Sequence, residues 1–191
     1  MNIAIIPARG GSRRIPRKNI RLFHGKPIIG YSIEAALASE LFDDIVVSTE
    51  DDEIADVAKT YGASVLARDP ALAADEVGTQ AVIAAACRQL ALNDYDGVCA
   101  IYPCAPLLTP RLLQHMMDML HLRPCSYVVA CYPNELRDAG AVYWGVAGAF
   151  VSFTPLISHA TGIFPFHGAI DINDESDWTL AEKMFEETRS I

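Results

Sequence analysis

Residues 3–19 read IAIIPARGGSRRIPRKN, a short apolar run that passes directly into a loop of glycines and cations. Residues 3–7 lack the polar/apolar alternation of a half-buried strand, which indicates a strand buried on both faces. The glycine pair lets backbone N–H groups approach a ligand closely, and the flanking cations offset negative charge. The loop is neither a P-loop nor a G-x-G-x-x-G fingerprint. The stretch therefore predicts a buried strand that ends in an anion-binding loop.

The same alternation of apolar runs and amphipathic segments continues along the chain. Further strands are predicted at residues 45–48, 64–67, 98–102 and 127–131. Helices are predicted at residues 27–39, 51–61 and 79–92, from Pro110 onward, and at the end of the chain with Ser176 as N-cap. Strands that alternate with helices are typical of an α/β fold with a doubly wound, mostly parallel sheet and helices on both faces.

The charge of the chain is distributed unevenly. The 191 residues carry a net charge of −9, yet the first 33 contain no Asp or Glu. These 33 residues include seven basic ones: Arg9, Arg13, Arg14, Arg17, Lys18, Arg21 and Lys26. Ligands of open parallel sheets bind beyond the carboxyl ends of the strands, which is where this basic segment lies in the predicted fold. Cations gathered there favour an anion of modest size, whereas an isolated charge run is more often a solvated loop.

Composition excludes several classes of protein. A chain that is 51% hydrophobic and 20% charged is not disordered, and its acidic balance speaks against nucleic acid as a partner. The five cysteines show neither a C-x-x-C pair nor metal-ligand spacing, so we expect reduced thiols. No apolar stretch approaches the roughly 18 residues of a membrane span. We therefore expect one cytoplasmic domain over residues 1–191, with no membrane partner.

Several motifs together resemble those of a known family. They are the loop through Ile20, the turn Gly25-Lys26-Pro27, the segments 46–51, 61–63, 68–70 and 102–106, and Asp171-Ile172-Asn173 with Asp177-Trp178. This set is similar to that of the cytidylyltransferases that activate nonulosonic acids, the CMP-sialic acid synthetases and their relatives. Arg14-Ile15-Pro16, Asp138-Ala139-Gly140 and Tyr143-Trp144-Gly145 most resemble the pseudaminic acid branch. The resemblance implies a Rossmann-like fold and transfer of CMP from CTP to an acidic nine-carbon sugar, with Mg²⁺ (or Mn²⁺) and release of pyrophosphate.

The resemblance also implies roles for individual residues. Arg9 and Lys18 match cations on the triphosphate. The other matched positions are Ala8, Gly10, Gly11 and Ser12 around the phosphates, Asn19 at the nucleotide, and Arg68 and Thr79 near the cytosine or ribose. A surface salt bridge is the competing interpretation for Arg68. For Arg13, Arg14, Arg17 and Arg21 a structural or solvated role is favoured over ligand contact.

The expected metal site departs from the family pattern. Two aspartates on a short strand, two residues apart, would face the same hard cation. Asp171 matches the first position, but Asn173 stands at the second, where its amide offers an oxygen without charge. For Asp174, Glu175 and Asp177 the favoured interpretation is an acidic first turn of the last helix.

A second departure is a shortened segment near residues 132–138, where the family carries sugar contacts and a dimerisation arm. A homodimer is implied by the resemblance, but this is its least supported part.

Cys104 follows a predicted strand without a partner base, so packing is favoured over nucleophilic catalysis. Two alternatives stay open: a sugar-phosphate nucleotidyltransferase of the same fold, and a module that binds a nucleotide or nucleotide-sugar without turnover.

Overall fold

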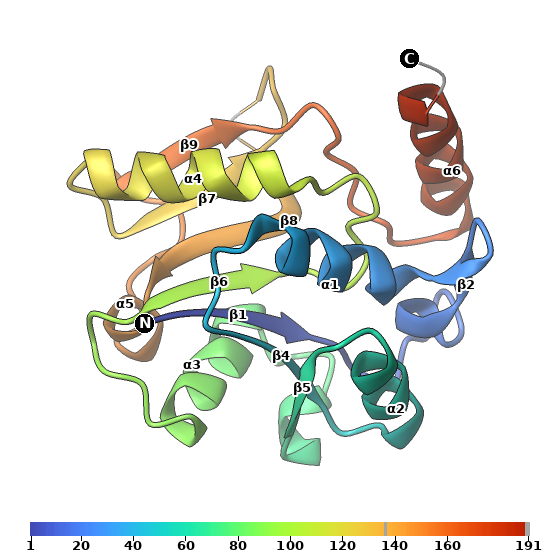
Figure 1. The fold of residues 1–191 in the computed structure, drawn as a ribbon, viewed down its shortest axis with the longest axis horizontal. Helices are drawn as coiled ribbons and strands as arrows, with labels where there is room; N and C mark the ends of the chain where they lie inside the picture. The colour runs from blue at the N-terminus through green and yellow to red at the C-terminus, as the bar shows by residue number, and fades with distance from the viewer. Residues whose placement is uncertain (136, 190–191) are drawn as a thin grey trace.

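A seven-stranded sheet organises the computed structural model, which describes residues 1–135 and 137–189 (Figure 1). In spatial order the strands are β5 (Ser64–Ala67), β4 (Asp44–Thr49), β1 (Asn2–Pro7), β6 (Gly97–Ile101), β8 (Asp138–Val146), β7 (Tyr127–Cys131) and β9 (Thr161–Pro165). β5, β4, β1 and β6 are parallel, β8 runs antiparallel to both β6 and β7, and β9 is parallel to β7. The mostly parallel α/β sheet predicted from the sequence is confirmed.

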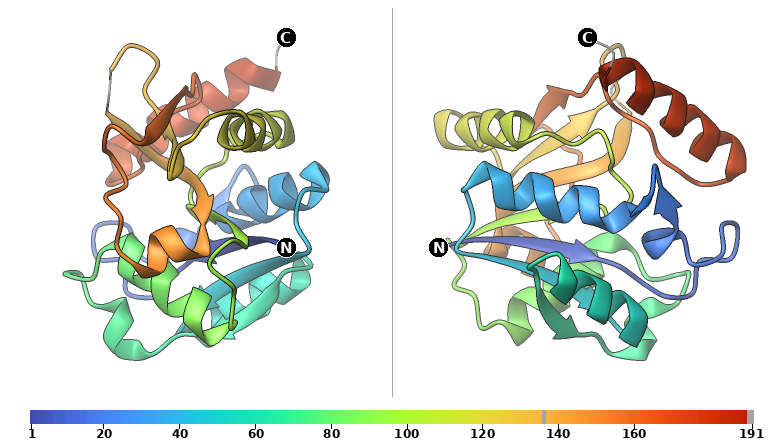
Figure 2. Two further views of the ribbon diagram at one scale, coloured as in Figure 1. Left: turned by 90° about the vertical axis from the view of Figure 1, so that its left-hand side faces the viewer. Right: turned by 45° about the vertical axis from the view of Figure 1, so that its right-hand side comes forward.

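Helices cover both faces of this sheet. They are α1 (Ile28–Ser39), α2 (Asp52–Thr60), α3 (Thr79–Gln89), α4 (Pro110–Leu122), α5 (Ala147–Val151) and α6 (Glu175–Arg189), with short 3₁₀ helices at Lys18–Ile20 and Pro70–Ala73. α1 and α4 lie on one side of the sheet, and α3 and α5 lie on the other (Figure 2). A two-stranded hairpin of β2 (Leu22–Phe23) and β3 (Lys26–Pro27) follows the first loop.

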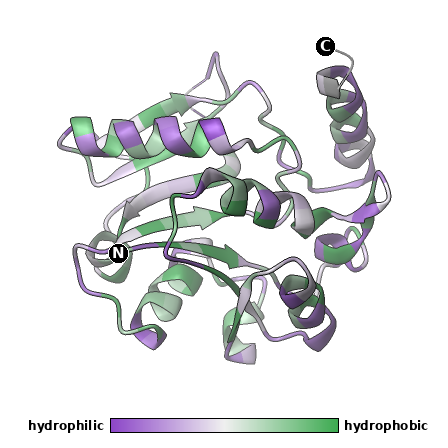
Figure 3. Cartoon of the chain, in the orientation of Figure 1, coloured by the Kyte–Doolittle hydropathy of each residue, from purple (hydrophilic) through white to green (hydrophobic). Residues whose placement is uncertain are grey.

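Strand β1 shows why the central strands are apolar throughout. Ala4 and Ile6 belong to the core under α1, α2 and α4, while Ile3 and Ile5 belong to the core under α3 and α5. All four side chains are buried, so successive residues face two different apolar layers. Figure 3 shows the result: the central strands are largely hydrophobic, whereas helices such as α4 alternate hydrophobic and hydrophilic residues along their length. None of the helices in the described part of the chain is long and apolar enough to cross a membrane.

Two strands were missed, and two local expectations were wrong. Strands β8 and β9 were not predicted, and residues 171–173 form no strand. The last helix begins one residue before Ser176, with Asp174 as the capping side chain: its Oδ1 accepts from the N–H groups of Ser176 and Asp177 at 2.9 and 3.1 Å. Asp177 in turn accepts from the N–H of Asp174 at 3.2 Å, a reciprocal arrangement that satisfies free helix N–H groups.

The helix cap at Asp51 ties the first loop to the sheet. Asp51 Oδ1 accepts from the N–H of Ile54 at 3.0 Å, while the carboxylate binds the guanidinium of Arg17 at 2.5 and 2.9 Å. The hydrogen bonds from Arg17 and, less strongly, from the helix N–H hold the pKa of Asp51 below its ordinary value. One carboxylate therefore caps α2 and anchors the loop that follows β1.

We expect Asp51→Ala to lower the free energy of unfolding by about 1–2 kcal/mol, because it removes both a cap and an ion pair. Asp51→Asn should recover part of this loss, since an amide oxygen still accepts from Ile54. The wild-type advantage over Asp51→Asn should be full above the ordinary carboxyl pKa and vanish as the pH falls through the lowered folded value. Urea denaturation at several pH values measures this. An Asp51→Ala variant as stable as the exposed control Asp56→Ala would contradict it.

Candidate active site

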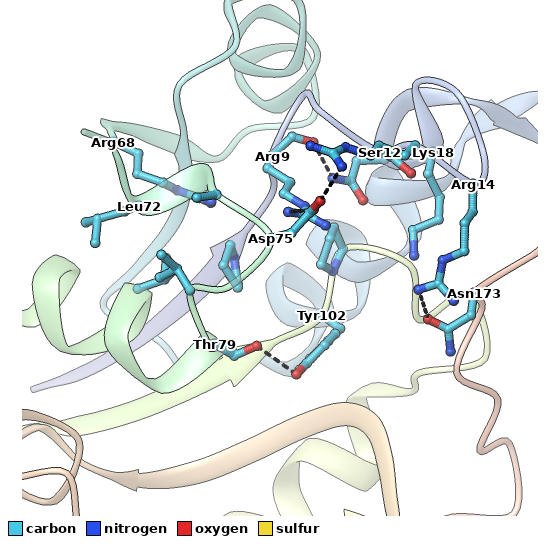
Figure 4. Close-up of a pocket in the computed structure, with 17 residues that line it drawn as sticks. Arg9, Ser12, Arg14, Lys18, Arg68, Leu72, Asp75, Thr79, Tyr102 and Asn173 are labelled. Atoms are coloured by element: carbon cyan, nitrogen blue, oxygen red, sulfur yellow. Dashed lines mark hydrogen bonds and ion pairs between the residues drawn. The ribbon is translucent and has the colours of Figure 1, made fainter. Parts of the chain in front are cut away.

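A cavity of about 530 Å³ opens at the carboxyl ends of the parallel strands. Its walls come from the loop after β1, from residues 68–82, from Tyr102 and Pro103 after β6, and from Asn173. Figure 4 shows side chains from these distant segments converging on one space. The basic segment therefore borders a real cavity at the edge of the sheet that the sequence indicates.

The arginines of the first loop divide into two groups. Arg9, Arg13, Arg14 and Lys18 line the cavity. Arg17 instead pairs with Asp51 and Glu53. The guanidinium of Arg21 pairs with Glu175 at 2.6 Å and stacks over the ring of Trp178 at 4.4 Å, which docks α6. Of the four arginines for which a structural or solvated role is favoured, Arg17 and Arg21 form structural ion pairs, while Arg13 and Arg14 are exposed side chains at the cavity.

Close packing explains one glycine of the loop. A Cβ on Gly10 would stand 2.3 Å from Asp51 Oδ2, so a side chain there collides with the cap of α2. Gly11 has open space where a Cβ would lie. The N–H of Gly10 donates to Glu50 Oε1 at 2.7 Å and that of Ser12 to the carbonyl of Gly10 at 3.0 Å. The loop is held by internal partners without a ligand.

Asn19 and Ala8, two further predicted positions, stabilise the loop through hydrogen bonds. Asn19 lines the cavity, but its amide also donates to the carbonyl of Arg9 at 2.9 Å and accepts from the Cys104 thiol at 3.2 Å. Ala8 is fully buried in the core, and its N–H donates to the carbonyl of Ser48 at 3.0 Å. Burial raises the pKa of Cys104 to about 12, which agrees with a packing thiol.

An acidic residue that the sequence analysis did not single out lies among the cations. Asp75 pairs with Arg9 at 2.6 Å and with Arg13 at 3.2 Å, from the segment between the second 3₁₀ helix and α3 (Figure 4). Arg9 also donates to the carbonyl of Ala73 at 3.2 Å. One carboxylate thus neutralises part of the positive charge of the cavity. The letters alone gave no signal, because ion pairing between residues so far apart depends on the fold.

The opposite end of the cavity is more apolar. Leu72 and Arg68 lie across the cavity from Lys18 and Asn173 (Figure 4), and Val77, Thr79 and Val82 line the same cavity. Arg68 is 8% exposed and donates to the carbonyl of Ser48, and burial lowers its pKa. Its guanidinium lies 3.8 Å from Glu50 Oε2, an oxygen without a hydrogen-bond partner in the described residues. Arg68 is therefore a buried cation at the cavity wall and not part of a surface salt bridge.

Of the two predicted metal positions, Asn173 lines the cavity at its cationic end, whereas Asp171 is not among the lining residues. Arg14 donates to Asn173 Oδ1 at 2.9 Å, and Lys18 donates to the carbonyl of Ile172 at 2.6 Å. Asp171 is exposed and lies against Gly140, where an added Cβ would be 3.1 Å from its carboxyl carbon. Because residues 171–173 are not a strand, the same-face argument for the Asp171 and Asn173 side chains does not apply.

These residues do not form a metal centre by themselves. Within residues 1–135 and 137–189, no group of three or more His, Cys, Asp or Glu side chains is placed to hold a metal ion. The oxygen of Asn173 already accepts from a cation, whereas the carboxylate of Asp171 is exposed. Such a donor set fits an ion that is held mainly by substrate phosphates and takes one protein carboxylate, an arrangement that Mg²⁺ commonly accepts.

Comparison with known sequences gives consistent relatives. The family model described as "Cytidylyltransferase" matches residues 3–138. The chain is 34% identical to a pseudaminic acid cytidylyltransferase of Campylobacter jejuni and 30% identical to a CMP-N,N'-diacetyllegionaminic acid synthase of Legionella pneumophila, each over 96% of both chains. These alignments span 222 and 223 positions, more than the 191 residues here, so the relatives carry segments that this chain lacks. Leu136, within the shortened segment, lies outside the described residues.

Solved structures agree on the fold. A CMP:2-keto-3-deoxy-manno-octonic acid synthetase complexed with CTP superposes with a TM-score of 0.76 at 14% identity, covering 98% of this chain and 100% of the other. A cytidylyltransferase of Leptospira borgpetersenii gives 0.71 at 15% identity, covering 99% and 94%. The family match over residues 3–138, together with 34% identity across nearly the whole length of a relative, shows that this chain belongs to the cytidylyltransferase family.

Proposed function

We propose that the protein transfers CMP from CTP to the anomeric hydroxyl of a nonulosonic acid of the pseudaminic or sialic acid type, with residues 1–191 acting as one nucleotidyltransferase domain. The observation that carries the proposal is the two-ended cavity. Arg9, Arg13, Arg14 and Lys18 line one end, and an apolar slot with one buried arginine lies at the other. The cationic end suits a triphosphate, and the apolar end suits a base. The relatives named above make CMP-linked sugars of this class.

The reaction needs positioning and charge neutralisation more than covalent help from the protein. The anomeric oxygen forms a bond to the α-phosphorus, the bond from that phosphorus to the bridging oxygen breaks, pyrophosphate leaves, and the hydroxyl proton passes to solvent. Arg9 and Lys18 hold the triphosphate and offset charge that develops on the leaving group. The N–H groups of Gly10 and Ser12 exchange their internal partners for phosphate oxygens, the N–H of Gly11 donates to the phosphates as well, and Asn19 keeps the loop in place.

A divalent ion, when bound, supplies Lewis-acid stabilisation of the phosphate oxygens. Asp171 would hold it through its carboxylate, and Asn173 would add an amide oxygen on release from Arg14. Arg14 then remains near the triphosphate as a further cation. Asp75 gives up its pairing with Arg9 and Arg13 when phosphate oxygens replace its carboxylate.

The assay that tests the proposal measures pyrophosphate release with each of the four nucleoside triphosphates against pseudaminic, N,N'-diacetyllegionaminic and N-acetylneuraminic acids. We expect release with CTP and at least one of these acids. Release only with a sugar phosphate would favour the other nucleotidyltransferase, and CTP binding without release under any condition would favour the binding module. The dimer implied by the resemblance stays a prediction, and sedimentation of the same preparation measures it.

We expect Arg9→Ala to weaken CTP binding or turnover by about 1.5–3 kcal/mol, roughly 10- to 150-fold, because it removes a charge-assisted phosphate contact. Isothermal titration of CTP, with turnover measured in parallel, reads this directly. Arg21→Ala is the matched control: it removes the same charge from the same segment, but Arg21 faces Glu175 and Trp178. Equal affinities for the two variants would argue against the assignment.

The metal assignment predicts a different pattern in three variants. Asp171→Ala should abolish turnover, since the ion loses its one protein carboxylate. Asn173→Asp should lower the Mg²⁺ concentration that gives half-maximal turnover, because added negative charge favours capture of the cation. Asp174→Asn should leave that concentration unchanged, as Asp174 caps α6 and an amide oxygen still accepts there. Turnover measured against Mg²⁺ concentration decides, and brisk turnover by Asp171→Ala would overturn the assignment.

A further inference from the structure

A row of hydroxyl groups leads from strand β8 to the cavity. Tyr143 Oη in β8 donates to Asp138 Oδ2 at the start of the same strand. Tyr143 Oη also lies 3.1 Å from Tyr102 Oη, and Tyr102 Oη lies 2.9 Å from Thr79 Oγ1 (Figure 4 shows this last contact). Tyr102 and Thr79 line the cavity, whereas Asp138 and Tyr143 lie behind them. The row therefore connects a carboxylate to the cavity wall through three hydroxyls.

Both tyrosines keep their protons. Tyr143 is 3% exposed, and burial is the largest cause of the upward shift in its pKa; burial likewise raises the pKa of Tyr102. The second oxygen of Asp138 accepts from the N–H of Gly140 at 2.8 Å. Each oxygen of the Asp138 side chain thus accepts one hydrogen bond, one from the backbone and one from a hydroxyl.

Counting protons fixes the direction of every bond in the row, because each hydroxyl has a single proton to donate. Tyr143 donates to Asp138, so Tyr102 must donate to Tyr143. The proton of Tyr102 is then used, so Thr79 must donate to Tyr102. Thr79 is left with lone pairs toward the cavity, which makes it an acceptor for any ligand there.

The position of Thr79 indicates which part of a ligand it meets. It lies beside Tyr102 and one helical turn from Val82 on α3, which also lines the cavity, whereas Lys18 and Asn173 lie on the other side of Tyr102 (Figure 4). A triphosphate belongs at the cationic end, so the apolar end with Leu72 and Val82 suits the faces of a base. Arg68 offers donors there, while Thr79 offers an acceptor. Cytosine carries an exocyclic amino donor at the atom where uracil carries a carbonyl acceptor.

We propose that Asp138, acting through Tyr143 and Tyr102, fixes Thr79 as a hydrogen-bond acceptor and thereby selects cytosine over uracil. The inference rests on the proposed function, because it takes the apolar end as the base site. Asp138, Tyr143 and Tyr102 are positioning residues here, and Thr79 is the contact. A carbonyl opposed to the lone pairs of Thr79 leaves two acceptors face to face, which disfavours UTP.

The experiment measures the dissociation constants of CTP and UTP by calorimetry without sugar, so that turnover plays no part. Asp138→Asn is nearly isosteric: its oxygen keeps the bond to Gly140, and its amino group donates to Tyr143. Every bond in the row then reverses, and Thr79 donates toward the cavity. We expect the preference for CTP over UTP to fall about tenfold or more. Thr79→Val should lower the preference too, and adding Asp138→Asn to it should have no further effect.

Tyr127→Phe is the matched control. Tyr127 is a buried tyrosine whose hydroxyl accepts from Gln80 at 3.3 Å outside the row, so its loss should leave the CTP to UTP ratio unchanged. A folded Asp138→Asn or Thr79→Val variant with the wild-type ratio of CTP to UTP affinity would overturn the inference. A second contrary result is an equal change in the dissociation constants of CTP and UTP, together with a loss of discrimination against 2′- or 3′-deoxy-CTP. That result would place a ribose hydroxyl at Thr79. If Asp138→Asn does not fold, Thr79→Val alone decides. Wild-type protein that binds no CTP would instead refute the proposed function.

Discussion

Repulsion among the cations of the first loop is the constraint on which the site depends. Arg9, Arg13, Arg14 and Lys18 line one cavity, and like charges so close together oppose the folded state unless acceptors face them. Asp75 faces the first two, while Asn173 and the carbonyl of Ile172 face the others. Segments far apart in the chain are thus held together by the charge of the loop, including the segment that begins α6.

The same constraint explains how the cavity is prepared for an anion. Each internal partner is a single carboxylate or a neutral oxygen, whereas a triphosphate brings several charged oxygens at once. A bound triphosphate would therefore offer these cations more charged oxygens than the internal partners do. Arg17 stays outside this exchange, because its ion pairs with Asp51 and Glu53 fasten the loop to α2. One short segment therefore carries both cations that line the cavity and cations that are held by ion pairs outside it.

The sequence predicts most of the fold because its central strands are buried on both faces. Runs such as residues 3–7 and 127–131 are apolar throughout and stand out between amphipathic helices. Strand β8 was not predicted, because residues 138–146 mix glycine, aromatic and polar residues. The strand is defined by its antiparallel pairing with β6 and β7. The cap of α6 was misplaced because Asp174 and Ser176 are both good caps, and only the reciprocal bond with Asp177 distinguishes them.

Part of the site could also be predicted from the sequence. The basic loop and its place beyond β1 follow from composition and fold class, whereas Asp75 and the row from Asp138 to Thr79 depend on contacts between distant segments. The proposed role of the loop cations is to hold the triphosphate of CTP, and a crystal structure of the protein with CTP tests it. We expect phosphate oxygens against Arg9 and Lys18, with Asp75 released and the cytosine between Arg68 and Thr79. A triphosphate bound elsewhere, with the Arg9–Asp75 pair intact, would contradict it.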